Sequence, residues 1–344
     1  MDLKSRSRPA RVLIVDDSAS VREALATILR AAPGLDVVGT APDAVVAWQK
    51  IKDLAPDVIT LDVEMPRLDG VSFLERLMTH YPIPVVMVSS MTARGCATTL
   101  RALELGAVDF VAKPKLDVVR GLELLADELA DKLRAAARAR VGARRVVTPR
   151  LQAGLIESTY KVVAIGASTG GTEALREVLS ALPPDAPGIV VVQHMPPLFT
   201  RSFAERLDGL SQIRVKEAED GDRILPGHAL IAPGGKHLKV QRSGASFTVE
   251  VFDGAPVNRH KPSVDVLFHS CALRLGASAV GVILTGMGDD GARGLAAMRK
   301  SGAHTISQDE ATSVVFGMPR EAIERGGAEQ VLPLQRIPSA LLAA

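Results

Sequence analysis

An apolar run that ends in two acidic residues sets the pattern for the first third of this chain, where residues 12–18 have the sequence VLIVDDS. Further mainly apolar runs follow at residues 58–61, 85–88 and 108–112, and helical stretches with hydrophobic residues at i, i+4, i+7 and i+8 lie between them. Strands of this kind, alternating with helices, predict a parallel sheet covered on both faces. Residues 36–39 supply a weaker fifth strand.

Length and composition indicate a globular protein with about two domains. The chain has 344 residues, with 47% apolar and 23% charged residues, which excludes a disordered or disulfide-stapled chain. Lysine and arginine number 41 against 39 acidic residues, so no overall field favours nucleic acid or anionic lipid. Cys96 and Cys271 are expected to be free thiols in a reducing compartment. No apolar stretch is long enough for a membrane span or a signal peptide, so we expect a cytoplasmic protein without membrane insertion. We also expect a monomer, because nothing in the sequence demands a larger assembly.

The second half of the chain alternates in the same way between apolar runs and stretches of helical spacing. Its predicted strands cover residues 161–167, 189–193, 230–232, 247–252, 279–285 and 304–307. We therefore expect one domain over residues 9–118, a linker over 119–157 and a second α/β domain over 158–344. The linker contains an Ala- and Arg-rich segment at 134–145, but no aromatic residues lie between its arginines, so a solvated helix end is favoured over a nucleic-acid surface.

Five polar residues follow or end four of the five predicted strands of the first domain: Asp16 and Asp17, Asp62, Ser89 and Lys113. The carboxyl ends of parallel strands meet at one edge of a sheet, where ligands bind, so three carboxylates are expected to converge there. Such a cluster favours a hard divalent cation, Mg²⁺, and an aspartate can accept a phosphoryl group, for which Asp62 is the candidate. The structural alternative is that Asp17 or Ser18 only caps a helix beginning near residue 19, and that Asp62 only starts a turn.

The first domain resembles the receiver domain of response regulators. The resemblance rests on LIVDDS at 13–18, LDVEMP at 61–66, VSS at 88–90 and KP at 113–114. It implies a flavodoxin-like, five-stranded parallel sheet, and phosphorylation of Asp62 by a histidine kinase. It also implies that Asp16, Asp17 and Asp62 hold Mg²⁺. Ser89 and Lys113 would contact the phosphoryl group.

A glycine-rich strand-to-helix turn opens the second domain, with GASTGG at residues 166–171. Ser168 lies in this turn, where the following amides can stabilise negative charge, as is typical of a nucleophile. The rival interpretation is a dinucleotide site. The spacing G-x-x-x-G-G differs from G-x-G-x-x-G, and Gln193 and His194 stand where an acidic residue would be needed.

A base and an acid complete the second constellation. His194 directly follows a buried strand, which places it at the same sheet edge as Ser168, whereas His228, His237 and His260 lie in polar or Pro/Gly-rich loops and are interpreted as surface or core residues. The acid is one of two adjacent residues, Asp289 and Asp290, after another strand, and spacing does not separate them.

The second domain is similar to the catalytic domain of the CheB family of chemotaxis protein-glutamate methylesterases. The resemblance rests on IGASTGG at 165–171, QHMP at 193–196, PVNRH to SVD at 256–265 and LTGMGDDG at 284–291. It implies a doubly wound α/β fold and the triad Ser168, His194 and Asp290. Thr169 and Met287 are implied to lie beside the site, near the oxyanion.

The implied reaction is hydrolysis of γ-glutamyl methyl esters on chemoreceptors, with deamidation of receptor glutamines as a second activity and no cofactor for the ester step. We expect the unphosphorylated receiver to block the Ser168 edge, and phosphorylation of Asp62 to relieve the block. The sequence disfavours two other classes of function. A DNA-binding output would need a helical domain with a basic recognition helix, and a nucleotide-binding oxidoreductase would need the phosphate fingerprint that these glycines lack.

Overall fold

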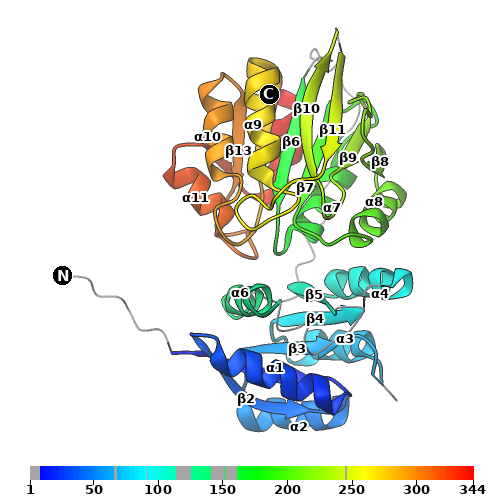
Figure 1. Ribbon diagram of the computed structural model, residues 1–344, viewed down its shortest axis with the longest axis vertical. Coiled ribbons are helices and arrows are strands. Elements are labelled where there is room, and N and C mark those ends of the chain that lie inside the picture. The colour runs from blue at the N-terminus through cyan, green and yellow to red at the C-terminus, as the bar shows by residue number, and fades with distance from the viewer. Residues whose placement is uncertain are drawn as a thin grey trace, which may run out of the picture. The chain divides into compact units, whose positions relative to one another are not determined.

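The computed structural model describes residues 8–65, 68–90, 92–113, 125–139, 141, 151, 161–244 and 246–344. The chain divides into two compact units, residues 1–144 (unit 1) and 145–344 (unit 2) (Figure 1). Most of the expected linker, 119–157, lies outside the described residues. Among the described helices, none has the length and hydrophobicity that a membrane span requires.

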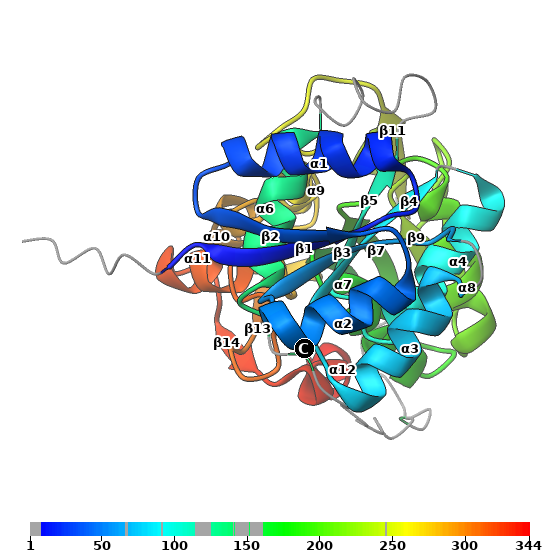
Figure 2. The same cartoon turned by 90° about the horizontal axis from the view of Figure 1, so that it is seen from below.

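Unit 1 is a five-stranded parallel sheet with helices on both faces, which confirms the predicted fold class. Its elements in chain order are β1 (Ala10–Val15), α1 (Ala19–Ala31), β2 (Leu35–Ala41), α2 (Ala44–Leu54), β3 (Val58–Asp62), α3 (Gly70–His80), β4 (Val85–Ser90), α4 (Ala93–Glu104), β5 (Asp109–Lys113) and α6 (Ala126–Ala136). The strand order is β2-β1-β3-β4-β5. Helices α1 and α6 pack together on one face, and α2, α3 and α4 lie on the other (Figure 2).

Four helices of unit 1 begin just after a side chain that accepts hydrogen bonds from the free N–H groups of the first turn. These caps are Ser18, Asp43, Asp69 and Thr92. The sequence left open whether Asp17 or Ser18 caps the first helix, and the structure assigns this role to Ser18. Asp17 is exposed, which leaves its carboxylate available at the sheet edge.

Helix α6 is joined to the sheet of unit 1 through Lys132, whose side chain is only 17% exposed. Its Nζ donates to Phe110 O at 2.6 Å and pairs with Asp109 at 3.3 Å and Glu128 at 2.9 Å. Burial alone would lower the pKa of this lysine, but the negative charges of Asp109 and Glu128 outweigh burial and raise it. The charged form is therefore held between helix and sheet.

Unit 2 is built on a seven-stranded parallel sheet with the order β14-β13-β12-β6-β7-β9-β8. Its elements are β6 (Val162–Ala167), α7 (Gly171–Ala181), β7 (Gly188–Gln193), α8 (Phe199–Leu210), β8 (Arg214–Glu217), β9 (His228–Ile231), β10 (His237–Ser243), β11 (Ser246–Phe252), α9 (Val264–Arg274), η1 (Gly276–Ser278), β12 (Ala279–Ile283), α10 (Ala292–Lys300), β13 (His304–Gln308), α11 (Met318–Glu324), β14 (Gln330–Leu332), η2 (Leu334–Arg336) and α12 (Ile337–Ala343). Side chains from α9, α10, α11 and the β10–β11 hairpin form one core cluster with the sheet. Helices α7, α8 and α12 form a separate layer.

One predicted strand of unit 2 lies outside the parallel sheet. Residues 247–252 belong to β11, which pairs antiparallel with β10. This hairpin packs on α9 through the buried Val240 and Val249, and Val240 N donates to Ser270 Oγ at 2.9 Å. Apolar alternation marks a strand with one buried face, but it does not specify which partner the strand takes.

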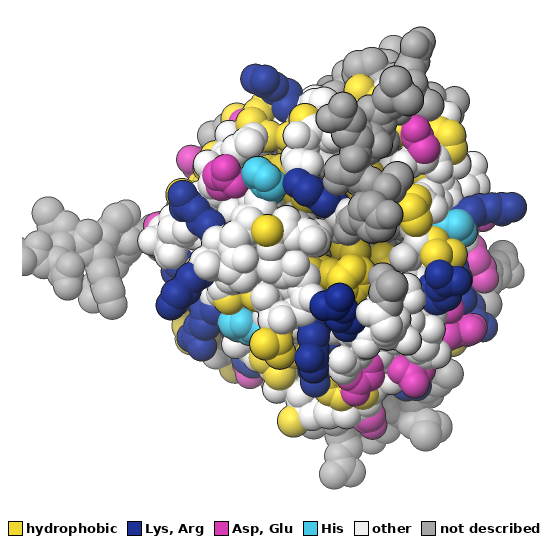
Figure 3. All heavy atoms as spheres, turned by 90° about the horizontal axis from the view of Figure 1, so that it is seen from above, with side chains coloured by type: hydrophobic (Ala, Val, Ile, Leu, Met, Phe, Trp, Pro, Cys, Tyr) yellow, Lys and Arg dark blue, Asp and Glu magenta, His cyan; other side chains and the backbone are white. Residues whose placement is uncertain are grey.

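On the end of unit 2 viewed in Figure 3, basic and acidic side chains are interspersed.

Replacing Lys132 with methionine is expected to destabilise unit 1 by about 3 to 5 kcal/mol, because it removes the positive charge that pairs with the buried carboxylate of Asp109 while keeping the apolar stem. Urea unfolding followed by fluorescence measures this, since the single tryptophan of the chain, Trp48, lies in α2 of unit 1. The control is Arg101→Ala, which breaks an exposed pair with Glu104 and should cost less than ~1 kcal/mol. Equal losses in both variants would contradict the anchoring role of Lys132.

Candidate functional site

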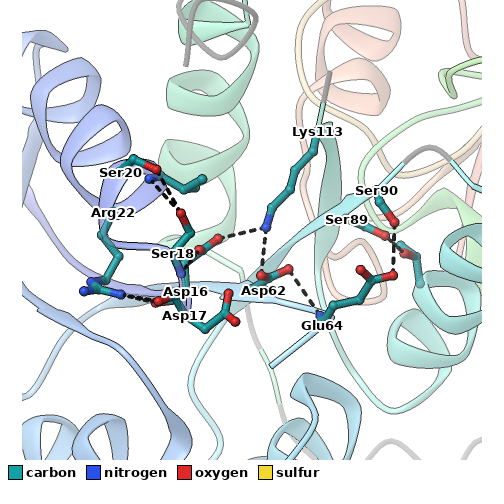
Figure 4. Close-up of polar contacts among 12 residues, drawn as sticks. Asp16, Asp17, Ser18, Ser20, Arg22, Asp62, Glu64, Ser89, Ser90 and Lys113 are labelled. Carbon is teal, nitrogen blue, oxygen red and sulfur yellow. Dashed lines mark hydrogen bonds and ion pairs between the residues drawn. The ribbon is translucent and has the colours of Figure 1, made fainter. Parts of the chain in front are cut away.

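In unit 1, two carboxylates and a lysine meet at the carboxyl edge of the sheet (Figure 4). Asp16 follows β1, Asp62 ends β3, and Lys113 ends β5. Lys113 Nζ lies 2.9 Å from Asp16 Oδ2 and 2.7 Å from Asp62 Oδ2. Strands β1 and β3 are neighbours in the sheet although β2 separates them in the chain. The order of strands therefore switches from one side of β1 to the other at this point, and open parallel sheets bind ligands at such a switch point.

The charges at this edge are finely balanced. Burial raises the pKa of Asp62 to about 6, the positive charge of Lys113 opposes this shift, and the negative charge of Asp16 adds to it. The two carboxylates raise the pKa of Lys113 more than its burial lowers it, so the ammonium form persists. Lys113 therefore compensates the negative charge of Asp62 only in part, because burial and the neighbouring Asp16 oppose it.

Three carboxylates at this edge form a donor set suited to a hard cation. One oxygen each from Asp16, Asp17 and Asp62 lies within 4.8 Å of the others. Oxygen donors with net negative charge are the ligands that divalent cations such as Mg²⁺ take. The donor types and their convergence fit the predicted metal site.

Ser89 ends up near this edge, but its hydroxyl is engaged with helix α4. Ser89 Oγ accepts from Thr99 Oγ1 at 2.6 Å and lies 3.4 Å from Gly95 O. Its neighbour Ser90 donates to Glu64 Oε1 at 3.2 Å (Figure 4). The structure thus brings Asp16, Asp62 and Lys113 into contact, while the Ser89 hydroxyl bonds elsewhere.

In unit 2, the three candidate residues follow three adjacent strands. Ser168 comes after β6, His194 after β7 and Asp290 in the loop after β12, and β6 lies between the other two strands. Backbone bonds tie these strand ends together: His194 N donates to Ala167 O at 3.2 Å, and Ser168 N donates to Thr285 O at 3.0 Å. The site occupies the switch point of this second parallel sheet.

A hydrogen bond of 2.8 Å joins His194 Nε2 to Asp290 Oδ2. Burial raises the pKa of Asp290, but bonds from His194, Asn258 and Ser263 lower it further, and the net pKa is well below the ordinary range. Asp290 is therefore an anion that only accepts, so His194 Nε2 must carry the proton. His194 Nδ1 is buried and makes no hydrogen bond to any described group. It is the ring nitrogen that can take up a proton.

The Asp290 carboxylate accepts five hydrogen bonds. Besides His194, its donors are Asn258 Nδ2 and Ser263 Oγ, both at 2.8 Å, and the backbone N–H groups of Val264 at 2.7 Å and Asp265 at 3.2 Å. The last two belong to the first turn of α9, whose free N–H groups and dipole stabilise an anion. Asp290 is thus fixed in position as well as in charge.

The structure separates the two adjacent aspartates that the sequence left equivalent. Asp290 is 1% exposed and faces His194, whereas Asp289 pairs at 3.0 Å with Arg325, the C-cap residue of α11. The N-cap of α10 is Gly291, so neither aspartate caps that helix with its side chain.

Ser168 lies on a tight turn that depends on glycine. Gly170 has φ of +77°, and a Cβ there would lie 2.6 Å from Val314 Cβ, so other residues would be strained. A Cβ on Gly286 would lie 2.8 Å from Ser168 Cβ, which places the loop carrying Met287 directly beside the serine. Thr169 is buried, and its carbonyl accepts from Thr285 Oγ1 at 2.9 Å.

Sequence reasoning gave no role to four residues that support the histidine and the aspartate. Asn258, Ser263 and Asp265 bond to Asp290, and the ring of His260 stacks on that of His194. His260 was interpreted as a surface or core residue because it lies in a polar loop. A signal was present in the density of polar side chains in residues 258–265 immediately before a predicted helix.

Comparison with known proteins identifies both units. Residues 163–341 match the family model of the CheB methylesterase, and residues 12–121 match the response regulator receiver domain. A protein-glutamate methylesterase/protein-glutamine glutaminase of Anaeromyxobacter dehalogenans is 58% identical, covering 98% of this chain and 97% of the relative. Its counterpart in Salmonella typhimurium is 57% identical, with coverages of 97% and 96%.

A solved structure agrees with these matches. The CheB methylesterase catalytic domain of Thermotoga maritima is 42% identical and superposes with a TM-score of 0.52, covering 53% of this chain and 97% of that domain. The resemblances found in the sequence are thereby confirmed. This chain belongs to the CheB methylesterase family, with a response regulator receiver domain preceding its methylesterase domain.

Proposed function

We propose that this methylesterase hydrolyses γ-glutamyl methyl esters on chemoreceptors through Ser168, His194 and Asp290. The observation that carries the proposal is the pairing of His194 Nε2 with a buried, fully ionised Asp290, which leaves Nδ1 as the base. The relatives are named for the same reaction on protein glutamates and glutamines. Chemoreceptors as substrates place the enzyme in chemotactic adaptation.

The reaction proceeds in two acyl-transfer steps. His194 Nδ1 takes the Ser168 hydroxyl proton while Oγ forms a bond to the ester carbonyl carbon. The C–O bond to the methoxy group then breaks, and methanol departs with the proton from His194. Water, deprotonated by the same nitrogen, attacks the acyl-serine and releases the glutamate and Ser168.

Negative charge develops on the carbonyl oxygen in both steps. We propose that groups at Thr169 and Met287, which flank Ser168, stabilise this charge together with the N-terminus of α7. A glutamine amide can follow the same route with ammonia as the leaving group, which gives a glutaminase activity. The amide depends more strongly on protonation by His194, because an amide nitrogen leaves poorly without a proton.

We propose that unit 1 controls unit 2 through phosphorylation of Asp62 by a histidine kinase. An Asp62 oxygen bonds to phosphorus while the bond to the donor histidine nitrogen breaks, and that nitrogen keeps the electron pair. Asp16, Asp17 and Asp62 would hold Mg²⁺, which offsets phosphoryl charge, and Lys113 supplies further positive charge at the same edge. The unphosphorylated receiver restricts access to Ser168, and phosphorylation relieves this inhibition.

Replacing Ser168 with alanine is expected to lower methanol release from methylated receptor membranes by about 10⁴-fold or more, because the nucleophile is lost. Release is measured for the full chain with receptors in membranes. Ser180→Ala, at the far end of α7, is the matched control and should retain wild-type release. Substantial release by Ser168→Ala would rule out the proposed nucleophile.

In the metal-free protein, the Asp62 carboxyl is expected to titrate with a midpoint of about 6, well above 3.8, because burial and Asp16 disfavour its charged form. The carboxylate, and with it the capacity to accept phosphate, therefore grows as pH rises through about 6. Carbon NMR of the labelled side chain measures the titration. Adding Mg²⁺ should move the midpoint to lower pH, while the exposed Asp253 of unit 2 should not respond. A midpoint indifferent to Mg²⁺ would argue against the metal site.

A small phosphodonor with Mg²⁺ is expected to raise methanol release by the full chain and to leave release by Asp62→Asn unchanged, because the variant has no acceptor carboxylate. Asp53→Asn on the exposed face of α2 is the control and should respond as the wild type does.

Unit 2 alone, residues 145–344, should release methanol faster than the unphosphorylated full chain. A slower truncated protein would contradict inhibition by the receiver.

A further inference from the structure

A second histidine lies against the ring of His194. The imidazole of His260 is parallel to it, with ring centroids 3.7 Å apart and an interplanar angle of 8°. The His194 side chain is only 8% exposed, whereas His260 is half-buried. His260 therefore covers one face of the base, while Asp290 holds the Nε2 edge.

His260 is the last residue of a tight turn at residues 257–260. Val257 and His260 exchange two backbone hydrogen bonds, of 3.0 and 2.9 Å, across the turn. The two residues between them, Asn258 and Arg259, have φ of +50° and +67°. Asparagine tolerates this region, but arginine rarely adopts it, so the surrounding contacts hold the turn in a strained form.

The same turn also binds the carboxylate of Asp290. Asn258 Nδ2 donates to Asp290 Oδ1 at 2.8 Å and lies 2.8 Å from Asp265 Oδ2, so one amide bridges two buried carboxylates. Asp265 is held in turn by Gly294 N on α10 at 2.7 Å. Two residues of one turn thus contact two members of the proposed triad: Asn258 bonds to the aspartate and His260 stacks on the histidine.

We propose that the 257–260 turn is a positioning device for the triad, in which His260 fixes the ring plane of His194 and Asn258 fixes the Asp290 carboxylate. A single hydrogen bond at Nε2 leaves the imidazole free to tilt about that contact, and a tilt displaces Nδ1 from the serine. A parallel flat ring at van der Waals distance removes this freedom. The inference rests on the proposed function, because it assigns His260 and Asn258 to the same Ser168 reaction.

Removing the flat surface is expected to lower kcat and leave KM nearly unchanged. His260→Ala should reduce kcat for methanol release by about 10- to 100-fold, the scale for a small misplacement of a reacting group. His260→Phe, which keeps a flat ring but no titratable nitrogen, should recover most of kcat. The control Lys261→Ala, which removes an exposed pair with Asp253 next to the turn, should behave as the wild type. Unchanged kcat in His260→Ala, or a Phe variant as slow as the Ala variant, overturns the proposal.

A second readout does not depend on the substrate. Proton NMR of the full chain should show the His194 Nε2–H, protected by its bond to Asp290, in the wild type and in His260→Phe. In His260→Ala this signal should exchange faster with water because the ring moves. Equal protection in all three proteins counts against the proposal. If the wild type releases no methanol that depends on Ser168, the proposed function fails, and this NMR comparison still tests the positioning role.

Discussion

The buried Asp290 carboxylate is the group on which the rest of unit 2 depends. A lone anion in the interior would cost free energy of folding, and five hydrogen-bond donors from separate parts of the chain compensate it. They are a histidine after β7, an amide and a hydroxyl in the loop before α9, and two N–H groups of α9 itself. Satisfying this charge brings β7, β12, the 257–263 loop and α9 to one point. The interactions that neutralise the acid therefore also assemble the site.

The two units solve the same problem in different ways. Each places its reactive groups at the carboxyl edge of a parallel sheet, at the strands where the chain order reverses. In unit 1 the carboxylates face one ammonium group and burial raises the pKa of Asp62, which suits a group that binds a cation and accepts phosphate. In unit 2 neutral donors and a histidine stabilise the anion, which suits a permanent charge beside a base.

Local sequence was enough to place most of the candidate residues at their strand ends. An apolar run with a polar end predicts both a buried strand and the edge at which its last residue lies, as for Asp62 and His194. The supporting residues lacked such a signal. His260 follows no predicted strand, and its contact with His194 joins segments 66 residues apart, which no local pattern encodes. Residues 247–252 had the alternation of a strand, and only packing on α9 assigned them to a hairpin.

The sequence by itself determined the α/β class, the two-domain order and Ser168 as the candidate nucleophile, because these follow from periodicity and from motifs contained in single turns. Tertiary structure decided which of two adjacent aspartates meets the histidine, since Asp289 and Asp290 share every local feature and differ only in what their side chains face. It also decided which imidazole nitrogen bonds to the acid and which is left without a hydrogen bond among the described groups. That assignment depends on the direction from which the acid approaches the ring, and long-range packing alone sets this direction.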